Sequence, residues 1–84
     1  MAQTVRITAL GDSLTQGYGL EPGQGLVPQL QVWLNARGQD VEMLNAGVSG
    51  DTTAGGLSRL DWTLADQPDA VIVALGGNDL LRGL

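Results

Sequence analysis

The chain has 84 residues and a formal net charge of −5, which allows one small domain with an acidic balance of charge. It contains no lysine and no run of arginines, so we expect no nucleic-acid partner. Cysteine and histidine are both missing, which argues against a disulfide framework and a zinc site, and we expect no metal and no cofactor. No apolar run is long enough to cross a bilayer, so no transmembrane segment is predicted. No leader peptide is visible, and both a cytoplasmic location and a periplasmic or secreted one with the leader removed remain open.

The first half of the chain predicts a strand, a loop and a helix. Residues 5–10 form the strand, which ends at Gly11, and residues 18–25 form a glycine-rich loop. A helix begins near residue 26, with Pro28 in its first turn and Gly38 as the glycine that follows its end. The apolar residues expected to share one face of this helix are Leu26, Val27, Leu30, Trp33 and Leu34.

The second half repeats this alternation. Residues 41–44 predict a second strand, and Asp51 or Thr52 can cap a helix that ends at residues 67–69. Residues 70–75 form a continuous apolar run without alternation, which is typical of a strand buried on both faces. Residues 80–84 are predicted to be a loop. The stripe expected along the second helix consists of Leu57, Leu60, Asp61 and Leu64.

The order strand, helix, strand, helix, strand predicts an α/β fold with parallel strands joined by right-handed crossovers. No internal repeat or linker interrupts it, so residues 1–84 belong to one domain. We expect Trp33 and Trp62 to pack helices against the sheet. Arg6, Arg37 and Arg59 stand singly and are expected to be solvated surface charges.

Three short polar blocks each follow a predicted strand. They are Gly-Asp-Ser-Leu at residues 11–14, a glycine-containing block at residues 45–52, and Gly-Gly-Asn-Asp at residues 76–79. In an open parallel sheet, ligands bind beyond the carboxyl ends of the strands. We therefore expect the three blocks to meet at one edge of the sheet.

Each block offers a group for anion or acyl chemistry, and each also has an ordinary interpretation. Ser13 exposes a hydroxyl above the sheet edge, or it and Asp12 cap the following turn. Gly50 can direct its backbone N–H at an anion, or it is a glycine needed for positive φ. Asn78 can donate its amide to an oxyanion, or it belongs to a common turn. The turn interpretation is sufficient for each residue alone, and the coincidence of three on one edge favours a site.

These blocks resemble those of the GDSL (SGNH) hydrolase family, within its small bacterial thioesterase, lysophospholipase and arylesterase subgroup. Residues 11–19 resemble its first block, residues 48–52 the second and residues 75–79 the third, in the right order and spacing. The resemblance covers essentially the whole chain. It implies the N-terminal β-α-β-α-β portion of a flavodoxin-like, three-layer α/β/α parallel sheet.

The resemblance also implies roles for individual residues. Ser13 would be the nucleophile, the backbone N–H groups of Ser13 and Gly50 and the side-chain amide of Asn78 would form the oxyanion hole, and Asp12 would orient the first block. The implied activity is hydrolysis of a small ester or thioester through an acyl-enzyme. The Asp-x-x-His block that the family carries near its C-terminus is absent, and no histidine is present to replace it. We therefore expect a complementary C-terminal fragment as a partner and an inactive isolated chain.

A second hypothesis is a non-catalytic module that binds a small anion or ligand at the same sheet edge. A helix N-terminus and glycine-rich loops suit such a ligand. Against this hypothesis, neither the phosphate-binding loop motif nor the dinucleotide fingerprint follows a predicted strand, and lysine is missing. Whether the chain is nicked, split or truncated, and which acyl group it accepts, stay open.

Overall fold

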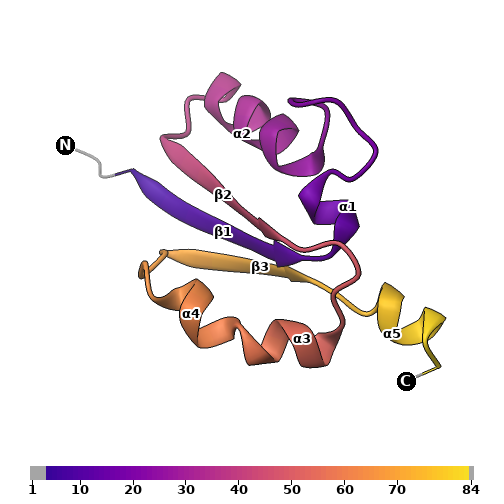
Figure 1. The fold of residues 1–84 in the computed structure, drawn as a ribbon. Coiled ribbons are helices and arrows are strands. Elements are labelled where there is room, and N and C mark those ends of the chain that lie inside the picture. Colours follow the sequence, from indigo (N-terminus) through magenta and orange to yellow (C-terminus); the bar gives the residue numbers. More distant parts are fainter. Residues whose placement is uncertain (1–3, 84) are drawn as a thin grey trace.

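The computed structural model describes residues 4–83. Helices flank both faces of a central sheet, so the molecule has three layers (Figure 1). The α/β fold predicted from the order of elements is confirmed. The elements along the chain are β1 (Val5–Gly11), α1 (Ser13–Gln16), α2 (Leu26–Ala36), β2 (Val41–Gly47), α3 (Thr53–Ser58), α4 (Leu60–Leu64), β3 (Ala70–Ala74) and α5 (Gly77–Leu81).

The sheet has the strand order β2-β1-β3, and both pairings are parallel, as predicted. β1 is the central strand and carries the first polar block at its end. Its last residue, Gly11, pairs with Gly47 of β2 and with Ala74 of β3. The carboxyl ends of all three strands therefore lie at the same level, which brings the polar blocks to one edge.

The core lies between α2 and the sheet. Ala9, Val27 and Met43 are its buried residues, and Leu30 and Leu34 of α2 pack against them. Only part of the apolar face predicted for α2 packs against the sheet, and the rest of this face is exposed to solvent. Among its residues, Leu26 is 54% exposed and Trp33 is 50% exposed.

The expected core position of Trp33 is therefore wrong. The ring lies under the side chain of Arg37, whose guanidinium carbon is 3.8 Å from the ring centroid. An arginine one turn further along the helix thus covers part of the ring, and the sheet does not. Trp62 is also outside the core, with 84% of its surface exposed.

The single helix predicted after the second block is divided into α3 and α4. The interruption falls at Arg59, whose backbone has φ −106° and ψ 6°. The two halves are too short to present one continuous stripe, and Leu57 is 73% exposed while Leu60 is partly buried. The predicted cap is confirmed, because the Thr52 hydroxyl accepts a hydrogen bond from the N–H of Gly55.

The prediction that residues 70–75 are buried on both faces is wrong for this structure. Within residues 4–83, β3 hydrogen-bonds to β1 alone, and its outer edge has no strand beside it. As a result Ile72 is 43% exposed and Val73 is 61% exposed. The loop predicted for residues 80–84 is also wrong over its first part, because α5 extends to Leu81; Leu84 lies outside the described residues.

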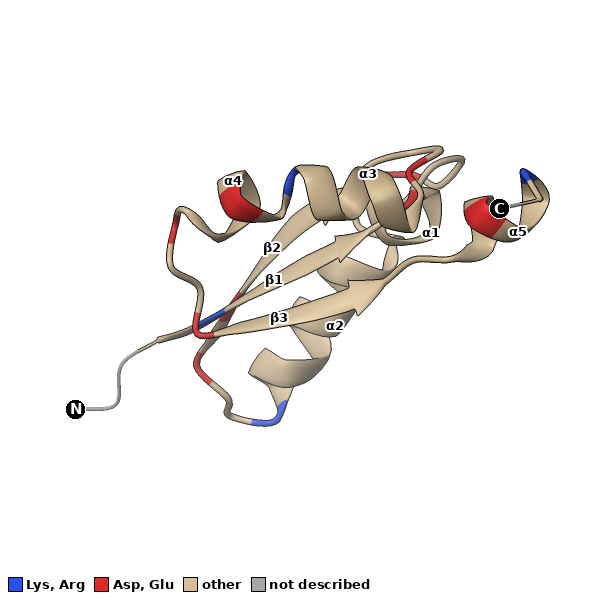
Figure 2. Ribbon diagram, turned by 90° about the horizontal axis from the view of Figure 1, so that it is seen from below, with Lys and Arg blue, Asp and Glu red and all other residues tan. Residues whose placement is uncertain are grey.

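The charged residues are scattered along the fold. Figure 2 shows arginines at well-separated positions and acidic residues mostly in loops and short helices. No helix found within residues 4–83 has both the length and the apolar character needed to span a membrane.

Gly47, the last residue of β2, lies directly under α1. A Cβ atom at this position would lie 2.7 Å from the Cα of Gln16 and 2.9 Å from the carbonyl carbon of Thr15. Because these are backbone atoms, the helix itself must shift. We expect Gly47→Ala to lower the free energy of unfolding by about 1–3 kcal/mol, measured by urea denaturation.

Gly25→Ala is the matched control for this prediction. Gly25 has an ordinary negative φ, and a Cβ there would come no closer than 3.4 Å to the Cα of Gly17. The control is expected to change stability by less than Gly47→Ala. Equal losses from the two variants would show that close packing of α1 on β2 is not what requires Gly47.

Candidate active site

The first block places Ser13 at the start of a short helix. Asp12 is 6% exposed and caps α1, with its Oδ1 accepting from the N–H of Leu14 at 3.0 Å. Ser13 is the first helical residue and is half-buried. The helix stops after one turn because Gly17 adopts φ +94° and donates its N–H to the Ser13 carbonyl. The capping interpretation of Asp12 therefore agrees with the structure, and the cap fixes the backbone that carries Ser13.

The second block makes a tight turn before α3. Gly50 has φ +82°, so the glycine meets a conformational requirement, as the ordinary interpretation predicts. The N–H of Asp51 closes the turn onto the Val48 carbonyl at 3.1 Å. The Gly50 carbonyl accepts from the Arg82 guanidinium at 2.9 Å. Both bonds are made by the peptide group that follows Gly50, because this group contains the Gly50 carbonyl and the Asp51 N–H.

The third block forms α5 and is tied to the second by side chains. The Nδ2 of Asn78 donates to the Asp51 carbonyl at 2.8 Å. The carboxylate of Asp79 accepts from the N–H of Thr53 at 2.8 Å and from its hydroxyl at 2.6 Å. The start of α5 is thereby fixed to the start of α3.

The three blocks meet at the carboxyl end of the sheet, as predicted. The N–H of Val48 donates to the Gly11 carbonyl at 3.0 Å, which joins the second block to the first. Asn78 and Asp79 join the third block to the second. The third block also approaches the first, because a Cβ on Gly77 would lie 3.9 Å from an Asp12 carboxylate oxygen. Polar groups more than sixty residues apart thus share one site.

Arg59 was expected to be a solvated surface charge, and this expectation is wrong. Its Nε donates to the Asp51 carboxylate at 2.8 Å, and its two terminal nitrogens donate to the carbonyls of Ala46 and Gly11 at 2.8 and 3.0 Å. Only 22% of the side chain is exposed. The sequence signal is faint, because Asp51 and Arg59 are eight residues apart, which is not the three- or four-residue spacing of paired side chains on a helix.

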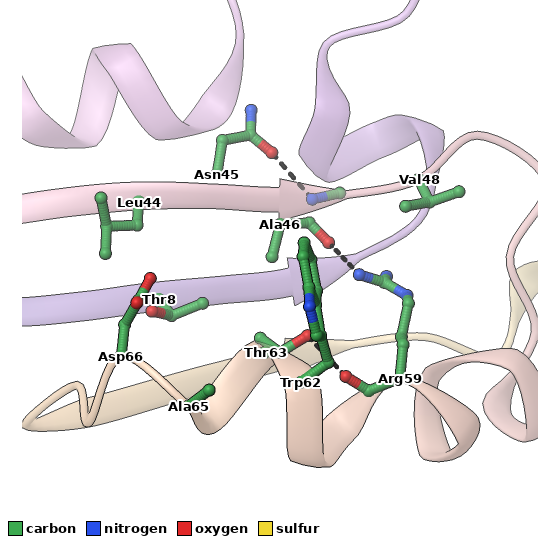
Figure 3. A pocket seen from close by; sticks show the side chains of 11 residues that line it. Thr8, Leu44, Asn45, Ala46, Val48, Arg59, Trp62, Thr63, Ala65 and Asp66 are labelled. Carbon is green, nitrogen blue, oxygen red and sulfur yellow. Dashed lines mark hydrogen bonds between the residues drawn. The ribbon is translucent and has the colours of Figure 1, made fainter.

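A cavity of about 550 Å³ adjoins the site on the α4 side of the sheet (Figure 3). Thr8 and Leu44 line it from the strands, and Trp62 from α4. Arg59 also lines it and points to the carbonyl of Ala46. Ser13, Gly50 and Asn78 are not part of its lining. Across residues 4–83, no three His, Cys, Asp or Glu side chains gather closely enough to hold a metal ion.

Two hydrogen bonds from Thr53, one from its hydroxyl and one from its N–H, hold the pKa of Asp79 below the ordinary value of 3.8. Because the folded state has the lower pKa, the link stabilises the fold above pH 4 and loses this effect as the pH falls through the lowered value. We expect wild type and Asp79→Asn to differ in urea midpoint at neutral pH, and the difference to shrink below about pH 4. A difference that is constant from pH 7 to the acid limit would contradict this link.

A family model for the GDSL-like lipase/acylhydrolase family matches residues 9–84 of this sequence, which includes all three blocks. The chain belongs to the GDSL-like lipase/acylhydrolase family. The resemblance stated from the sequence is thus confirmed.

Individual members of the GDSL-like family agree closely with this chain. Esterase TesA of Pseudomonas aeruginosa is 48% identical over 84 residues, covering 99% of this chain and 41% of the relative. The crystal structure of AlinE4, an SGNH-hydrolase family esterase, has a TM-score of 0.90 at 50% identity and covers 100% of this chain and 46% of that one. The psychrotrophic esterase EstA from Pseudoalteromonas sp., in a structure inhibited by monoethylphosphonate, has a TM-score of 0.86 at 42% identity, with coverages of 94% and 44%. The chain thus spans less than half the length of these GDSL-like relatives.

Proposed function

We propose that the chain supplies the nucleophile and the oxyanion hole of a serine hydrolase that acts on small esters or thioesters. The observation that carries this proposal is the joining of the three blocks at one sheet edge, through the bonds from Val48 to Gly11 and from Asn78 to Asp51. Membership of a family of lipases and acylhydrolases supports the same chemistry. Residues 1–84 then form the N-terminal portion of a single domain.

The proposed reaction is acyl transfer. The Ser13 oxygen attacks the carbonyl carbon of the substrate, and its proton passes to a histidine supplied from outside this chain. The carbonyl oxygen becomes an oxyanion, which collapses and expels the alcohol or thiol that has received the proton. Water then attacks the acyl group on Ser13, releases the acid and restores the hydroxyl.

Three donors suit the developing oxyanion. Ser13 is the first residue of α1, so its N–H has no acceptor within the helix. The N–H of Gly50 belongs to a turn whose neighbouring carbonyls are held by hydrogen bonds. Asn78 uses one N–H of its amide on the Asp51 carbonyl, and the second N–H of that nitrogen can serve the substrate. Donors that are already positioned stabilise the transition state without further reorganisation.

The general base is proposed to come from a complementary C-terminal fragment that carries the Asp-x-x-His block. Among the described residues 4–83, no strand pairs with the outer edge of β3, and this supports such a partner, since a free strand edge offers a row of backbone donors and acceptors. On the face of β3 that is covered by α3 lies an apolar cavity of about 270 Å³, lined by Leu10, Leu57, Val73 and Leu75 among others. A strand added to β3, with apolar side chains over this cavity, would give the sheet the cover that it lacks.

The test uses the chain with and without this partner. A chain of the same sequence is expected to have negligible esterase turnover when pure, and to gain turnover when combined with a fragment bearing Asp-x-x-His. An alkylphosphonate probe, the class of inhibitor named for EstA, is expected to label Ser13 stoichiometrically in the assembled enzyme. Turnover by the pure chain would contradict the need for a partner. Absence of labelling in the assembly would contradict the hydrolase and favour the anion-binding module.

A further inference from the structure

Arg59 lies at the junction of α3 and α4, where both of its backbone polar groups form hydrogen bonds. Its N–H donates to the carbonyls of Gly55 and Leu57 at the end of α3. Its carbonyl accepts from the N–H and the hydroxyl of Thr63, at 2.9 and 2.8 Å. With the backbone fixed on both sides, the side chain extends from the helices toward the strand ends (Figure 3).

The three acceptors of the guanidinium belong to three different parts of the site. The Gly11 carbonyl closes β1 and precedes Asp12 and Ser13, and the Ala46 carbonyl lies at the end of β2. The Asp51 carboxylate follows Gly50 directly. One side chain therefore fixes the strand that carries Ser13, the neighbouring strand and the turn that carries Gly50.

Arg59 is also connected to the third block, through Asp51. Its side chain is 11% exposed, and its two carboxylate oxygens are used separately, by Arg59 at 2.8 Å and by the N–H of Thr52 at 3.1 Å. The Asp51 carbonyl accepts from Asn78 at 2.8 Å. A shift of Asp51 therefore moves the partner that orients the Asn78 amide.

We propose that Arg59 is a positioning residue of the hydrolase, which sets the distance between the Ser13 hydroxyl and the oxyanion donors of Gly50 and Asn78. This inference rests on the proposed function. Arg59 acts through the backbone carbonyls and Asp51, and not on substrate. A planar guanidinium can serve three acceptors in fixed directions, whereas the single ammonium of lysine cannot reproduce that fork. The charge is therefore not sufficient, and the geometry of the group is what the site requires.

The experiment compares Arg59→Lys with Arg37→Lys in the assembled enzyme. Arg37 is the matched control because its guanidinium lies over Trp33 on α2 and donates to none of the three blocks. Competent sites are counted by phosphonate titration, so that kcat is expressed per labelled Ser13. We expect Arg59→Lys to lower kcat per site by about 10²-fold with KM changed less than about threefold. Arg37→Lys is expected to match wild type.

A merely structural role would reduce thermal stability and the number of titrated sites while leaving kcat per site within about twofold of wild type, and this result would overturn the inference. If the wild-type assembly itself neither labels nor turns over, the proposed function fails. In that case, amide NMR of the chain tests whether Arg59 positions Gly50 and Asn78. Arg59→Lys is expected to shift the Gly50 N–H and the Asn78 side-chain signals, and Arg37→Lys is not. Unchanged signals in Arg59→Lys would again overturn the inference.

Discussion

Ser13→Ala is expected to lower kcat of the assembled enzyme by about 10⁵- to 10⁶-fold and to abolish phosphonate labelling. The substitution removes the only group that can form the acyl-enzyme in the proposed reaction. It leaves the fold nearly intact, because Ser13 is half-buried and α1 is capped by the neighbouring Asp12. The measurement is steady-state hydrolysis of an aryl ester, with mass spectrometry of the labelled chain.

Ser58→Ala is the control for Ser13. Ser58 lies on the exposed side of α3, where its hydroxyl donates to the Gly55 carbonyl at 2.7 Å. It contacts none of the groups proposed for the reaction, so its turnover and labelling are expected to equal those of wild type. Substantial turnover by Ser13→Ala, after correction for contaminating esterase, would rule out Ser13 as the nucleophile.

Asn78→Ala is expected to reduce kcat by about 10²- to 10³-fold, which is the usual loss on removing one oxyanion donor. KM is expected to change little, because the donor acts on charge that develops in the transition state. The variant also loses the hydrogen bond to the Asp51 carbonyl, so stability should fall by about 1 kcal/mol. Activity and urea denaturation are measured on the same samples.

Asn35→Ala is the control that separates the loss of an oxyanion donor from the loss of a stabilising hydrogen bond. Asn35 lies on α2, far along the chain from the third block, and its Nδ2 donates to the Gln39 carbonyl at 3.0 Å. This variant therefore loses a bond of the same kind, an amide to a backbone carbonyl, without touching the site. A kcat for Asn78→Ala no lower than that for Asn35→Ala would show that Asn78 is not an oxyanion donor.

The strands and their parallel arrangement could be predicted because apolar runs alternated with helical segments. The prediction for residues 5–10 is confirmed by β1, whereas β2 runs to Gly47, beyond the predicted residues 41–44. The extra residues include Asn45, which breaks the apolar pattern. Its amide donates to the carbonyls of Thr15 and Gln16, so a polar residue at the strand end is satisfied by partners that lie 30 and 29 residues away along the chain. Periodicity alone does not contain that information.

The part of the site that could not be predicted depends on backbone acceptors. Two of the three partners of Arg59 are carbonyl groups, and the Gly11 carbonyl is 48 residues away along the chain. Every residue has a carbonyl, so no residue type marks these positions in the sequence. The exposure of Trp62 was missed for a related reason. An apolar pattern does not reveal that the helix breaks at Arg59, which leaves Trp62 84% exposed beside the cavity that it lines.

The central position of β1 has a consequence for the order of folding. β1 is made first, and β2 can pair with it early, but its other edge must wait for β3. A pair of hydrogen bonds between Arg6 and Asp69, 63 residues apart, then joins the beginnings of β1 and β3. Pairings over such distances form slowly, because much chain must be ordered before any contact is gained. We therefore expect the edge of β1 that faces β3 to pair later than the edge that faces β2, so that the pairing of the strand leading to Ser13 is completed only when β3 is in place.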